Sequence, residues 1–428
     1  MALPKVRAAA CHFAPMIFEA RKSCEKAIGL IHEAAHRGAN LVVFPESAIP
    51  GFPIWSALLP PTRTHDFFQL FAQSSLLIDG EEISAIRHAA AKSKVIVSLG
   101  FSEKVRYSTG TLFNTNILIG EQGELLIHHR KLVPTFFEKL SWSPGDGYGL
   151  RVANTKFGKI GALICGENTN PLARYALMAQ GEQIHISTWP AVWPTRDLHG
   201  SVQDNAAEPP SSTSKPSTNR HDGQGQGRPD QTVGNLSGTQ TEEVDRAFAT
   251  SNYDNTAANR TRAAAHCFEA KSFGISCAGH LDQDMVSRLT ELVGDADGLR
   301  IKKTLDMSQR ATTQFFDPTG RLLQSFNYNH SHDKTDGVIS DETPHHEIHY
   351  ADLDLNQCVE GKQYHDVVGG YQRFDVFSLT VNRQRSEPAT FVDSGLKTSA
   401  SPSRGAVPNG HPTEAQLGIN IGNGSANS

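Results

Sequence analysis

Cys165 is the residue in this chain best placed to act as a nucleophile. It ends the apolar run Ile160–Ile164 and is followed by a glycine and a glutamate. A cysteine that ends a buried strand and opens a helix can meet a substrate at the sheet edge, where the first N–H groups of the helix favour a thiolate. The chain has 6 cysteines and no Cys-x-x-Cys pair, so we expect the others to be mostly inert core residues.

Glu46 and Lys131 are candidate partners for this thiol. Glu46 directly follows the apolar run Leu41–Phe44 and has prolines on either side, so its carboxylate can be held partly desolvated and act as a general base. Lys131 ends another expected strand, where a fixed positive charge can lower the pKa of a cysteine and stabilise a tetrahedral intermediate. Each has an ordinary alternative, because Glu46 fits a surface turn and Arg130–Lys131 fits a solvated strand end.

Short apolar runs alternate with amphipathic stretches along the first half of the chain, which is typical of an α/β layer structure. The expected strands are 6–12, 41–44, 95–101, 113–119, 124–129, 160–164 and 184–187. Helical spacing of apolar residues predicts helices over 19–36 and 81–92. Farther along we expect a helix over 257–271, a strand over 273–278 and a strand, turn and strand over 314–323. Together these elements predict a mixed sheet with helices outside it.

Two polar interruptions and a polar tail break this pattern. Residues 199–248 form a low-complexity insertion that we expect to be disordered, because it has too few apolar residues to offset its ordering entropy. A second polar loop is expected over 329–344, and a disordered tail over 394–428. We therefore expect a single catalytic domain over 5–391 that these segments interrupt.

The net charge and the lengths of the apolar runs limit the kinds of partner that this chain is expected to bind. The chain has 428 residues and a formal net charge of -5, which gives no electrostatic footprint for nucleic acid or an anionic membrane. It contains no apolar run approaching the 18 or so residues needed to span a bilayer, and no sustained apolar segment follows the N-terminus. We expect a cytoplasmic protein directed at a small molecule, with no nucleic-acid or membrane partner.

Three motifs carry a family resemblance. Phe44-Pro45-Glu46, the run His129-Arg130-Lys131-Leu132 with its following Pro134-Thr135, and Cys165-x-Glu167-Asn168 occur in this order along the chain. Together with Glu138 they resemble the nitrilase superfamily of carbon-nitrogen hydrolases. The stretch from residue 128 to 138 and the run after Cys165 are most similar to the nitrilase branch.

The resemblance implies a four-layer αββα sandwich with a charged site. Glu46 is then the general base, Lys131 stabilises the tetrahedral intermediate, and Cys165 is the nucleophile. Glu138 is the second glutamate, which positions substrate or assists proton transfer. No metal or organic cofactor is implied. The family also implies a homo-oligomer built from dimers that can extend into spirals.

The reaction implied is the hydrolysis of an organic nitrile to a carboxylic acid and ammonia. A thiolate attack on the nitrile carbon divides a difficult hydrolysis into two easier steps. Alternatives are an amidase or a nitrile-hydrating enzyme with the same residues. From another class, a non-catalytic interaction protein that recruits a partner through residues 199–240 is also considered, although it gives no reason to keep all four charged and thiol groups.

Three further residues are candidate substrate-binding positions: Gly166, Trp55 and Trp189. Many nitrilases have tryptophan after the nucleophile, so Gly166 predicts extra room for bulky aryl-aliphatic or branched nitriles, and its backbone N–H is a candidate donor to the developing anion. The two tryptophans lie near catalytic segments but equally fit core positions. His345, Glu347 and His349 share one strand face but fit a solvated strand end better than a metal site.

Overall fold

The structure, a computed structural model, describes residues 2–194, 253–328, 338–339 and 348–389. The chain divides into a unit made of Met1–Pro194 and Asp254–Ser428 and a second unit, Thr195–Tyr253. Nearly all described residues belong to the first unit. The insertion expected over 199–248 and the tail expected over 394–428 lie outside the described residues.

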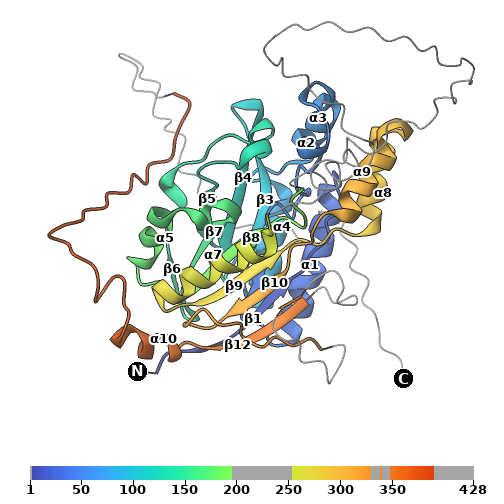
Figure 1. The fold of residues 1–428 in the computed structure, drawn as a ribbon. Coiled ribbons are helices and arrows are strands. Elements are labelled where there is room, and N and C mark those ends of the chain that lie inside the picture. The colour runs from blue at the N-terminus through green and yellow to red at the C-terminus, as the bar shows by residue number, and fades with distance from the viewer. Residues whose placement is uncertain (1, 195–252, 329–337, 340–347, 390–428) are drawn as a thin grey trace, which may run out of the picture. The chain divides into compact units, whose positions relative to one another are not determined.

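One sheet of six strands carries the N-terminal part of the chain (Figure 1). Its strands, in spatial order, are β12 (Ile348–Asp354), β1 (Lys5–Cys11), β2 (Leu41–Val43), β3 (Ile96–Val105), β4 (Ser108–Ile119) and β5 (Leu125–Arg130). The central strands β1, β2 and β3 are parallel, and the other neighbours are antiparallel. Parallel neighbours need crossover connections, and these contain α1 (Ala20–His36) and α4 (Glu81–Ser93).

A second sheet of six strands follows the same plan. Its order is β11 (Val338–Ile339), β10 (Thr313–Phe316), β9 (Phe273–Ala278), β8 (Ile184–Trp189), β7 (Gly158–Ile164) and β6 (Ala153–Thr155). Here β7, β8 and β9 are parallel, and the other three neighbouring pairs are antiparallel. The crossovers contain α5 (Pro171–Met178) and α7 (Asn255–Ala270). Each sheet therefore has helices to cover one face.

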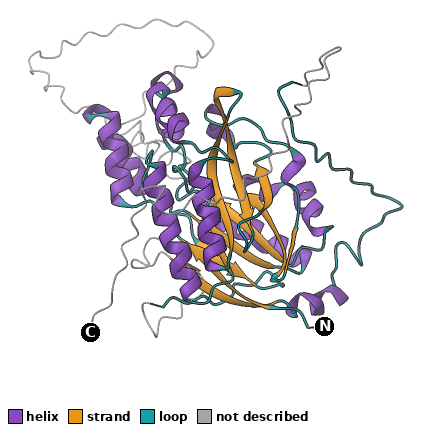
Figure 2. Ribbon diagram, turned by 180° about the vertical axis from the view of Figure 1, so that it is seen from behind, coloured by secondary structure: helices purple, strands orange, loops and turns teal. Residues whose placement is uncertain are grey.

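The two sheets pack face to face because their strands alternate between two apolar environments. In β1, Ala8 and Ala10 join a buried cluster with Ile160, Ile184 and other residues of the second sheet. The intervening residues of β1 pack instead with the helices α1 and α4. On the other side, α7 packs on β9, and Figure 1 shows it crossing the second sheet. Seen from behind, the strands lie between helices (Figure 2). The result is the expected four-layer αββα sandwich.

The remaining helices gather around an aromatic cluster at one side of the fold. They are α2 (Trp55–Leu58), α3 (His65–Ser74), α8 (Gln283–Val293) and α9 (Asp295–Met307), while the short α10 (Gln357–Glu360) follows β12. Aromatic and aliphatic side chains from α2, α3 and α8 share one buried cluster with Phe137 and Trp142. Among the described helices, none has the length and apolar character needed to cross a membrane.

The structure differs from the sequence-based expectations at several places. The expected polar loop over 329–344 includes a described pair of strand residues, β11, which pairs with β10. After β10 the chain returns only as an isolated bridge between Phe316 and Leu322, rather than as a full strand. Cys165 opens a short 3₁₀ turn, Cys165–Thr169, and the helix α5 begins only at Pro171. The helix expected directly at Cys165 was therefore placed too early.

Several candidate residues follow strands that end at the same edge of their sheet. Glu46 follows β2 and Lys131 follows β5 directly. Since β3 and β5 are each antiparallel to β4, β5 runs in the same direction as β2 and β3. In the second sheet Cys165 follows β7, one of the three parallel strands. The carboxyl ends of such strands are where α/β sheets present side chains to a ligand.

Gly100 lies on β3 at the point where the loop that carries Glu46 packs closely against the first sheet. A Cβ atom there would lie 2.2 Å from the Pro45 carbonyl oxygen and 3.1 Å from the Glu46 Cα atom. We expect Gly100→Ala to displace this loop and lower the free energy of unfolding by about 1–3 kcal/mol, measured by denaturant titration.

Gly29→Ala is the matched control. Gly29 lies in the middle of α1, and a Cβ atom there would have no heavy atom within 4 Å. Alanine is the better helix former, so this variant should be more stable by roughly 0.5–1 kcal/mol. Equal stability of Gly100→Ala and the parent protein would show that the loop can move to make room for the methyl group without a loss of stability.

Candidate active site

Glu46 lies buried at the end of β2, although it is charged. Only 3% of the residue is exposed, which excludes the surface-turn alternative. Its Oε1 accepts hydrogen bonds from Lys131 Nζ at 2.8 Å and from Asn114 Nδ2 at 2.7 Å. Its Oε2 has no hydrogen-bond partner among the described residues. One carboxylate oxygen is thus held in place and the other is available to accept a proton.

Lys131 supplies the positive charge of the site. Its side chain is fully buried, and Nζ donates to Glu138 Oε1 at 2.9 Å and Oε2 at 2.7 Å as well as to Glu46. The preceding Arg130 is also buried and forms an ion pair with Glu103. The alternative of a solvated strand end therefore fails for both residues.

Glu138 is held by the turn in which it lies. A short 3₁₀ helix, Phe136–Leu140, begins after Thr135 with a capping box. The Glu138 carboxylate accepts the Thr135 backbone N–H at 2.9 Å, while the Thr135 side chain accepts the backbone N–H of Glu138. This reciprocal pair fixes the carboxylate beside Lys131, so both oxygens are committed to named donors.

Cys165 meets this charged group from the second sheet. Its sulfur, one oxygen of Glu46 and one oxygen of Glu138 all lie within 4.8 Å of one another, and all three residues are buried. Cys165 has a φ of +49°, in the left-handed region that costs a non-glycine residue about 1 kcal/mol or more. The backbone therefore turns sharply at the thiol, which points it toward the first sheet rather than along the strand.

The charges around the thiol favour its neutral form. Burial raises the pKa of Cys165 well above its usual range; the charge of Glu46 raises it further, and Lys131 only partly opposes this. The sequence-based expectation of a thiolate stabilised by a helix N-terminus was wrong, because α5 begins only at Pro171 and because burial and the charge of Glu46 oppose a negative charge on the sulfur. The thiol therefore needs a base when it reacts, and the free Glu46 oxygen lies close by.

The pKa values of Lys131 and Glu138 are both raised, for different reasons. Burial alone would lower the pKa of Lys131, but the negative charges of Cys165, when ionised, and of the two carboxylates raise it well above its usual value. Burial raises the pKa of Glu138 to about 7, and the charge of Glu46 adds to this while Lys131 opposes it. Lys131 is therefore a permanent cation, and Glu138 titrates near neutral pH.

Glu167 ties the lysine loop to the cysteine loop. It accepts the backbone N–H of Leu132 at 2.6 Å and of Ile164 at 2.8 Å, and His129 Nε2 lies 2.9 Å from its Oε2. Burial alone would raise the pKa of Glu167, but the charge of His129 and these hydrogen bonds lower it. One buried carboxylate thus sets the spacing between Lys131 and Cys165.

The two candidate pocket tryptophans occupy different places. Trp189 is fully buried in one cluster with Cys165, and its Nε1 donates to Ser276 Oγ at 2.7 Å. Trp55 is packed among Phe67, Phe71 and other residues of the aromatic cluster. Both side chains are core aromatics in this structure, and their contact with substrate stays a prediction.

Gly166 lies against the turn that holds Glu138. A Cβ atom at this position would stand 2.8 Å from Thr135 Oγ1. Any side chain at Gly166 must therefore displace the hydroxyl that caps the Glu138 turn. Glycine keeps that turn undisturbed, and the prediction that it also leaves room for bulky substrates stays open beside this role.

Sequence reasoning missed the polar residues that support the four candidates. Asn114 fixes Glu46, and Glu167 fixes both loops, yet neither was assigned a role. A signal for Asn114 was present, since Asn114-Thr115-Asn116 is a run of polar residues within the apolar strand β4, and all three are buried. Buried polar residues need partners, so such a run indicates a polar site beneath the surface.

Two groups in the described part of the chain have the residue types of a metal site. The first is Glu46, Glu138 and Cys165, but Lys131 Nζ already lies between the two carboxylates and supplies the cation. The second is Glu182, His185 and His266, which lies behind the cysteine loop. Of the strand residues weighed for a metal, His345 and Glu347 lie outside the described residues.

Comparisons with known proteins agree with this geometry. A model of the carbon-nitrogen hydrolase family matches residues 7–206. "Nitrilase 3" from an unknown prokaryotic organism is 39% identical over 188 residues, 43% of this chain and 56% of that protein. "Cyanide hydratase" of Alternaria brassicicola is 28% identical over 427 residues, 98% of this chain and 94% of that protein. The stronger identity thus spans little more than half the length of the curated relative.

A solved structure has the same fold. The carbon-nitrogen hydrolase from Helicobacter pylori G27 superposes with a TM-score of 0.54 at 17% identity, covering 87% of this chain and 97% of that chain. At this identity the likeness concerns the sandwich of two sheets and not the substrate. Fold, motifs and family match agree, and the chain belongs to the nitrilase superfamily of carbon-nitrogen hydrolases.

Proposed function

We propose that this carbon-nitrogen hydrolase is a nitrilase, which converts an organic nitrile and two waters to a carboxylic acid and ammonia. The observation that carries the proposal is the buried Lys131 ammonium between Glu46 and Glu138, with the Cys165 thiol beside both carboxylates. A neutral thiol, a base and a fixed cation are the groups needed to add a nucleophile to an unactivated carbon-nitrogen bond.

In the first half of the reaction Glu46 takes the proton of Cys165 as the sulfur bonds to the nitrile carbon. The electron pair of the broken π bond goes to nitrogen, which receives the proton and gives a thioimidate. Glu46 Oε2, which lacks a partner among the described residues, is the oxygen suited to this transfer. Lys131 stabilises the negative charge that develops during attack, because its charge is fixed and desolvated.

In the second half Glu46 activates a water that adds to the thioimidate carbon. The tetrahedral adduct expels ammonia once its nitrogen is protonated, leaving a thioester. A second water then releases the acid and returns the proton to Cys165. Glu138 holds Lys131 throughout and fixes its orientation.

A nitrile-hydrating activity is the second candidate, favoured by the similarity to a protein named cyanide hydratase along nearly the whole chain. The two reactions diverge at the tetrahedral adduct. If the sulfur leaves instead of ammonia, the product is an amide and the thiol is regenerated at once. The position of the proton on that adduct selects the product, and Glu46, Glu138 and Lys131 are the groups that control it.

Cys165→Ala should abolish ammonia release from every nitrile in a panel of aliphatic, arylacetic and aromatic compounds, because no covalent intermediate can form. The matched control is Cys24→Ala, which removes another buried thiol in α1 far along the chain from the site motifs. That variant should keep its activity. Product analysis should show acid from nitriles; release of ammonia only from the corresponding amides would contradict the nitrilase proposal in favour of an amidase.

The pH profile should report Glu138. Its pKa of about 7 means that the carboxyl is protonated below this value and ionised above it. Protonation removes one of the two charges that hold Lys131, so kcat/KM should fall as the pH is lowered through about 7. Glu138→Gln should lower kcat/KM by roughly 10²–10⁴-fold and lose this acidic limb. An unchanged limb in the variant would assign the titration to another group.

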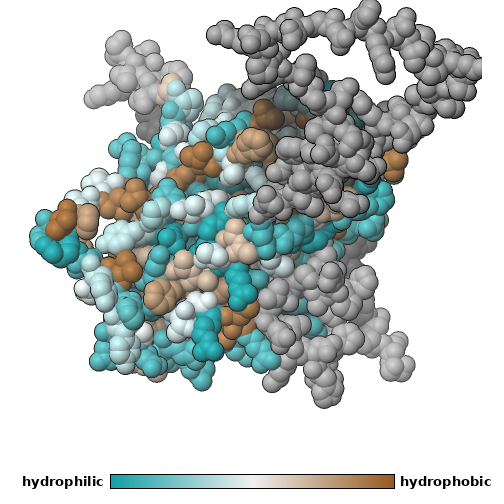
Figure 3. All heavy atoms as spheres, in the orientation of Figure 1, coloured by the Kyte–Doolittle hydropathy of each residue, from teal (hydrophilic) through white to brown (hydrophobic). Residues whose placement is uncertain are grey.

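We also propose that the protein is a homo-oligomer. After α10 the chain runs outward from the sheets before it returns, where Arg385 pairs with Asp146 (Figure 1). In between, Phe374 and Phe377 are each 75% exposed, and Figure 3 shows apolar surface along this side. Together with Leu172 on α5, these side chains line one groove. An exposed apolar groove is typical of a protein-protein interface, and we propose that a second copy of the chain binds there.

A double substitution tests this interface. Phe374→Asp with Phe377→Asp should reduce the mass measured by size-exclusion chromatography with light scattering, because charges replace the exposed apolar surface. Tyr107→Asp, at an exposed tyrosine between β3 and β4, is the control and should leave the mass unchanged. Equal masses for the double variant and the parent protein would place the interface elsewhere.

A further inference from the structure

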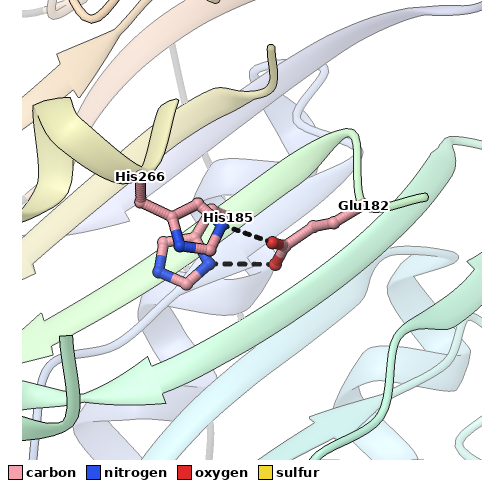
Figure 4. Close-up of side chains that lie close together, drawn as sticks. All are labelled: Glu182, His185 and His266. Carbon is pink, nitrogen blue, oxygen red and sulfur yellow. Dashed lines mark hydrogen bonds and ion pairs between the residues drawn. The ribbon is translucent and has the colours of Figure 1, made fainter. Parts of the chain in front are cut away.

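A second buried polar group lies behind the cysteine loop, and the proposed mechanism does not use it. It consists of Glu182, which precedes β8, His185 on β8 and His266 on α7 (Figure 4). All three side chains are essentially inaccessible. Glu182 Oε1 lies 2.9 Å from His185 Nδ1, and Oε2 lies 2.6 Å from His266 Nε2. One carboxylate therefore joins two imidazoles whose rings stack with centroids 3.5 Å apart.

This group connects to the nucleophile through Asn168. His185 Nε2 and Ser187 Oγ lie 2.9 Å from Asn168 Oδ1. Asn168 Nδ2 donates to the carbonyl oxygens of Cys165 at 3.0 Å and Leu163 at 3.3 Å. Two carbonyl acceptors on one side fix which way the amide faces, because only its NH₂ group can donate to them.

The hydrogen bonds assign the protons. Asn168 Oδ1 is an acceptor, so His185 Nε2 must carry a proton, and Glu182 requires a proton on His185 Nδ1 as well. Burial alone would raise the pKa of Glu182, but His185 and His266 lower it to about 2; burial lowers the pKa of His266 to about 4. His266 is therefore neutral near pH 7, and its Nδ1 has no partner among the described residues.

The space for Glu182 is also built into the sheet. Gly161 on β7 pairs with His185, and a Cβ atom at Gly161 would lie 2.2 Å from Glu182 Oε1. Only glycine leaves room for the carboxylate at this place. The carboxylate is thus accommodated by the strand that leads into Cys165.

We propose that a His185 imidazolium, held by Glu182, orients the Asn168 amide and so holds the backbone turn that aims the Cys165 thiol at Glu46. His185, Glu182 and Asn168 are positioning residues, and His266 only anchors the far carboxylate oxygen. The inference rests on Cys165 being the nucleophile of the proposed function. The left-handed backbone conformation at Cys165 is unfavourable by itself. The hydrogen bond from the Asn168 amide to the Cys165 carbonyl oxygen stabilises it.

A direct hydrogen-bonded chain fits this group better than a metal ion. A bound metal needs free lone pairs on its ligands, yet each imidazole nitrogen facing Glu182 is already within hydrogen-bond distance of an oxygen. The NH of His185 on its other side is committed to Asn168. Three groups that satisfy one another need no ion.

Glu182→Gln separates charge from shape. The neutral amide can still accept from His185 Nδ1, but it no longer supports a second proton on the ring. Where the glutamine oxygen faces Nδ1, the one remaining proton stays on that nitrogen, and His185 Nε2 becomes an acceptor opposite Asn168 Oδ1. The Asn168 amide then loses the donor that orients it and releases the Cys165 carbonyl. We expect kcat to fall about 10–100-fold with KM changed less than about threefold, and the alkylation rate of Cys165 by iodoacetamide to fall in parallel.

Two matched variants guard against misfolding. His266→Gln keeps a neutral donor toward Glu182, so it should retain kcat within about threefold. His185→Leu should behave like Glu182→Gln, because leucine has no donor for Asn168 Oδ1. Thermal unfolding of all three is measured beside the kinetics, since a buried change lowers stability whatever its role.

The outcomes are distinct. Loss of kcat and of thiol alkylation in Glu182→Gln and His185→Leu, with His266→Gln spared at similar unfolding temperatures, supports the positioning role of His185, Glu182 and Asn168. Losses that follow only the unfolding temperature across the three variants overturn it. So does one equivalent of zinc that the parent protein retains and Glu182→Gln loses. The alkylation rate is measured without a nitrile. It therefore still tests the positioning role of these residues if the protein fails to hydrolyse nitriles.

Discussion

The ammonium group of Lys131 is the interaction on which the site depends. A fully buried cation has lost the stabilisation of water, and its removal from solvent costs several kcal/mol unless anions compensate. Glu46 comes from the end of β2, and Glu138 from the turn after β5. Because both must reach one nitrogen, the positions of these two loops are coupled. The same coupling places two carboxylates within reach of the Cys165 sulfur.

This arrangement explains why the thiol is neutral before it reacts. Two carboxylates and one ammonium leave an excess of negative charge beside Cys165, and the thiol is buried. Such an environment opposes a free thiolate. Deprotonation becomes favourable only as the sulfur shares its charge with substrate. Reactivity is thereby coupled to the presence of an electrophile that fits.

The sequence was sufficient for those features that depend on local pattern. Alternating apolar runs placed most strands of both sheets, and β9 matches its expected bounds fully. The four candidate residues lie together, although nothing local in the chain says that β5 and β7 belong to different sheets. The strand β6 was missed because its three residues are too few to show a pattern. The helices α8 and α9 were missed as well, although α8 buries Met285, Val286 and Leu289 along one regular face. The helix expected at Cys165 was wrong because a polar, capped turn intervenes.

The supports of the nucleophile could not be predicted because they join distant segments. Glu167 and Asn168 are neighbours in sequence, yet they bind in opposite directions. Glu167 reaches His129 and the backbone after β5 in the first sheet, while Asn168 reaches β8 in the second. The short turn that begins at Cys165 is therefore hydrogen-bonded to both sheets. The reactive geometry depends on the packing of alanine, valine and isoleucine between the sheets, because any shift between them acts on that turn from two sides.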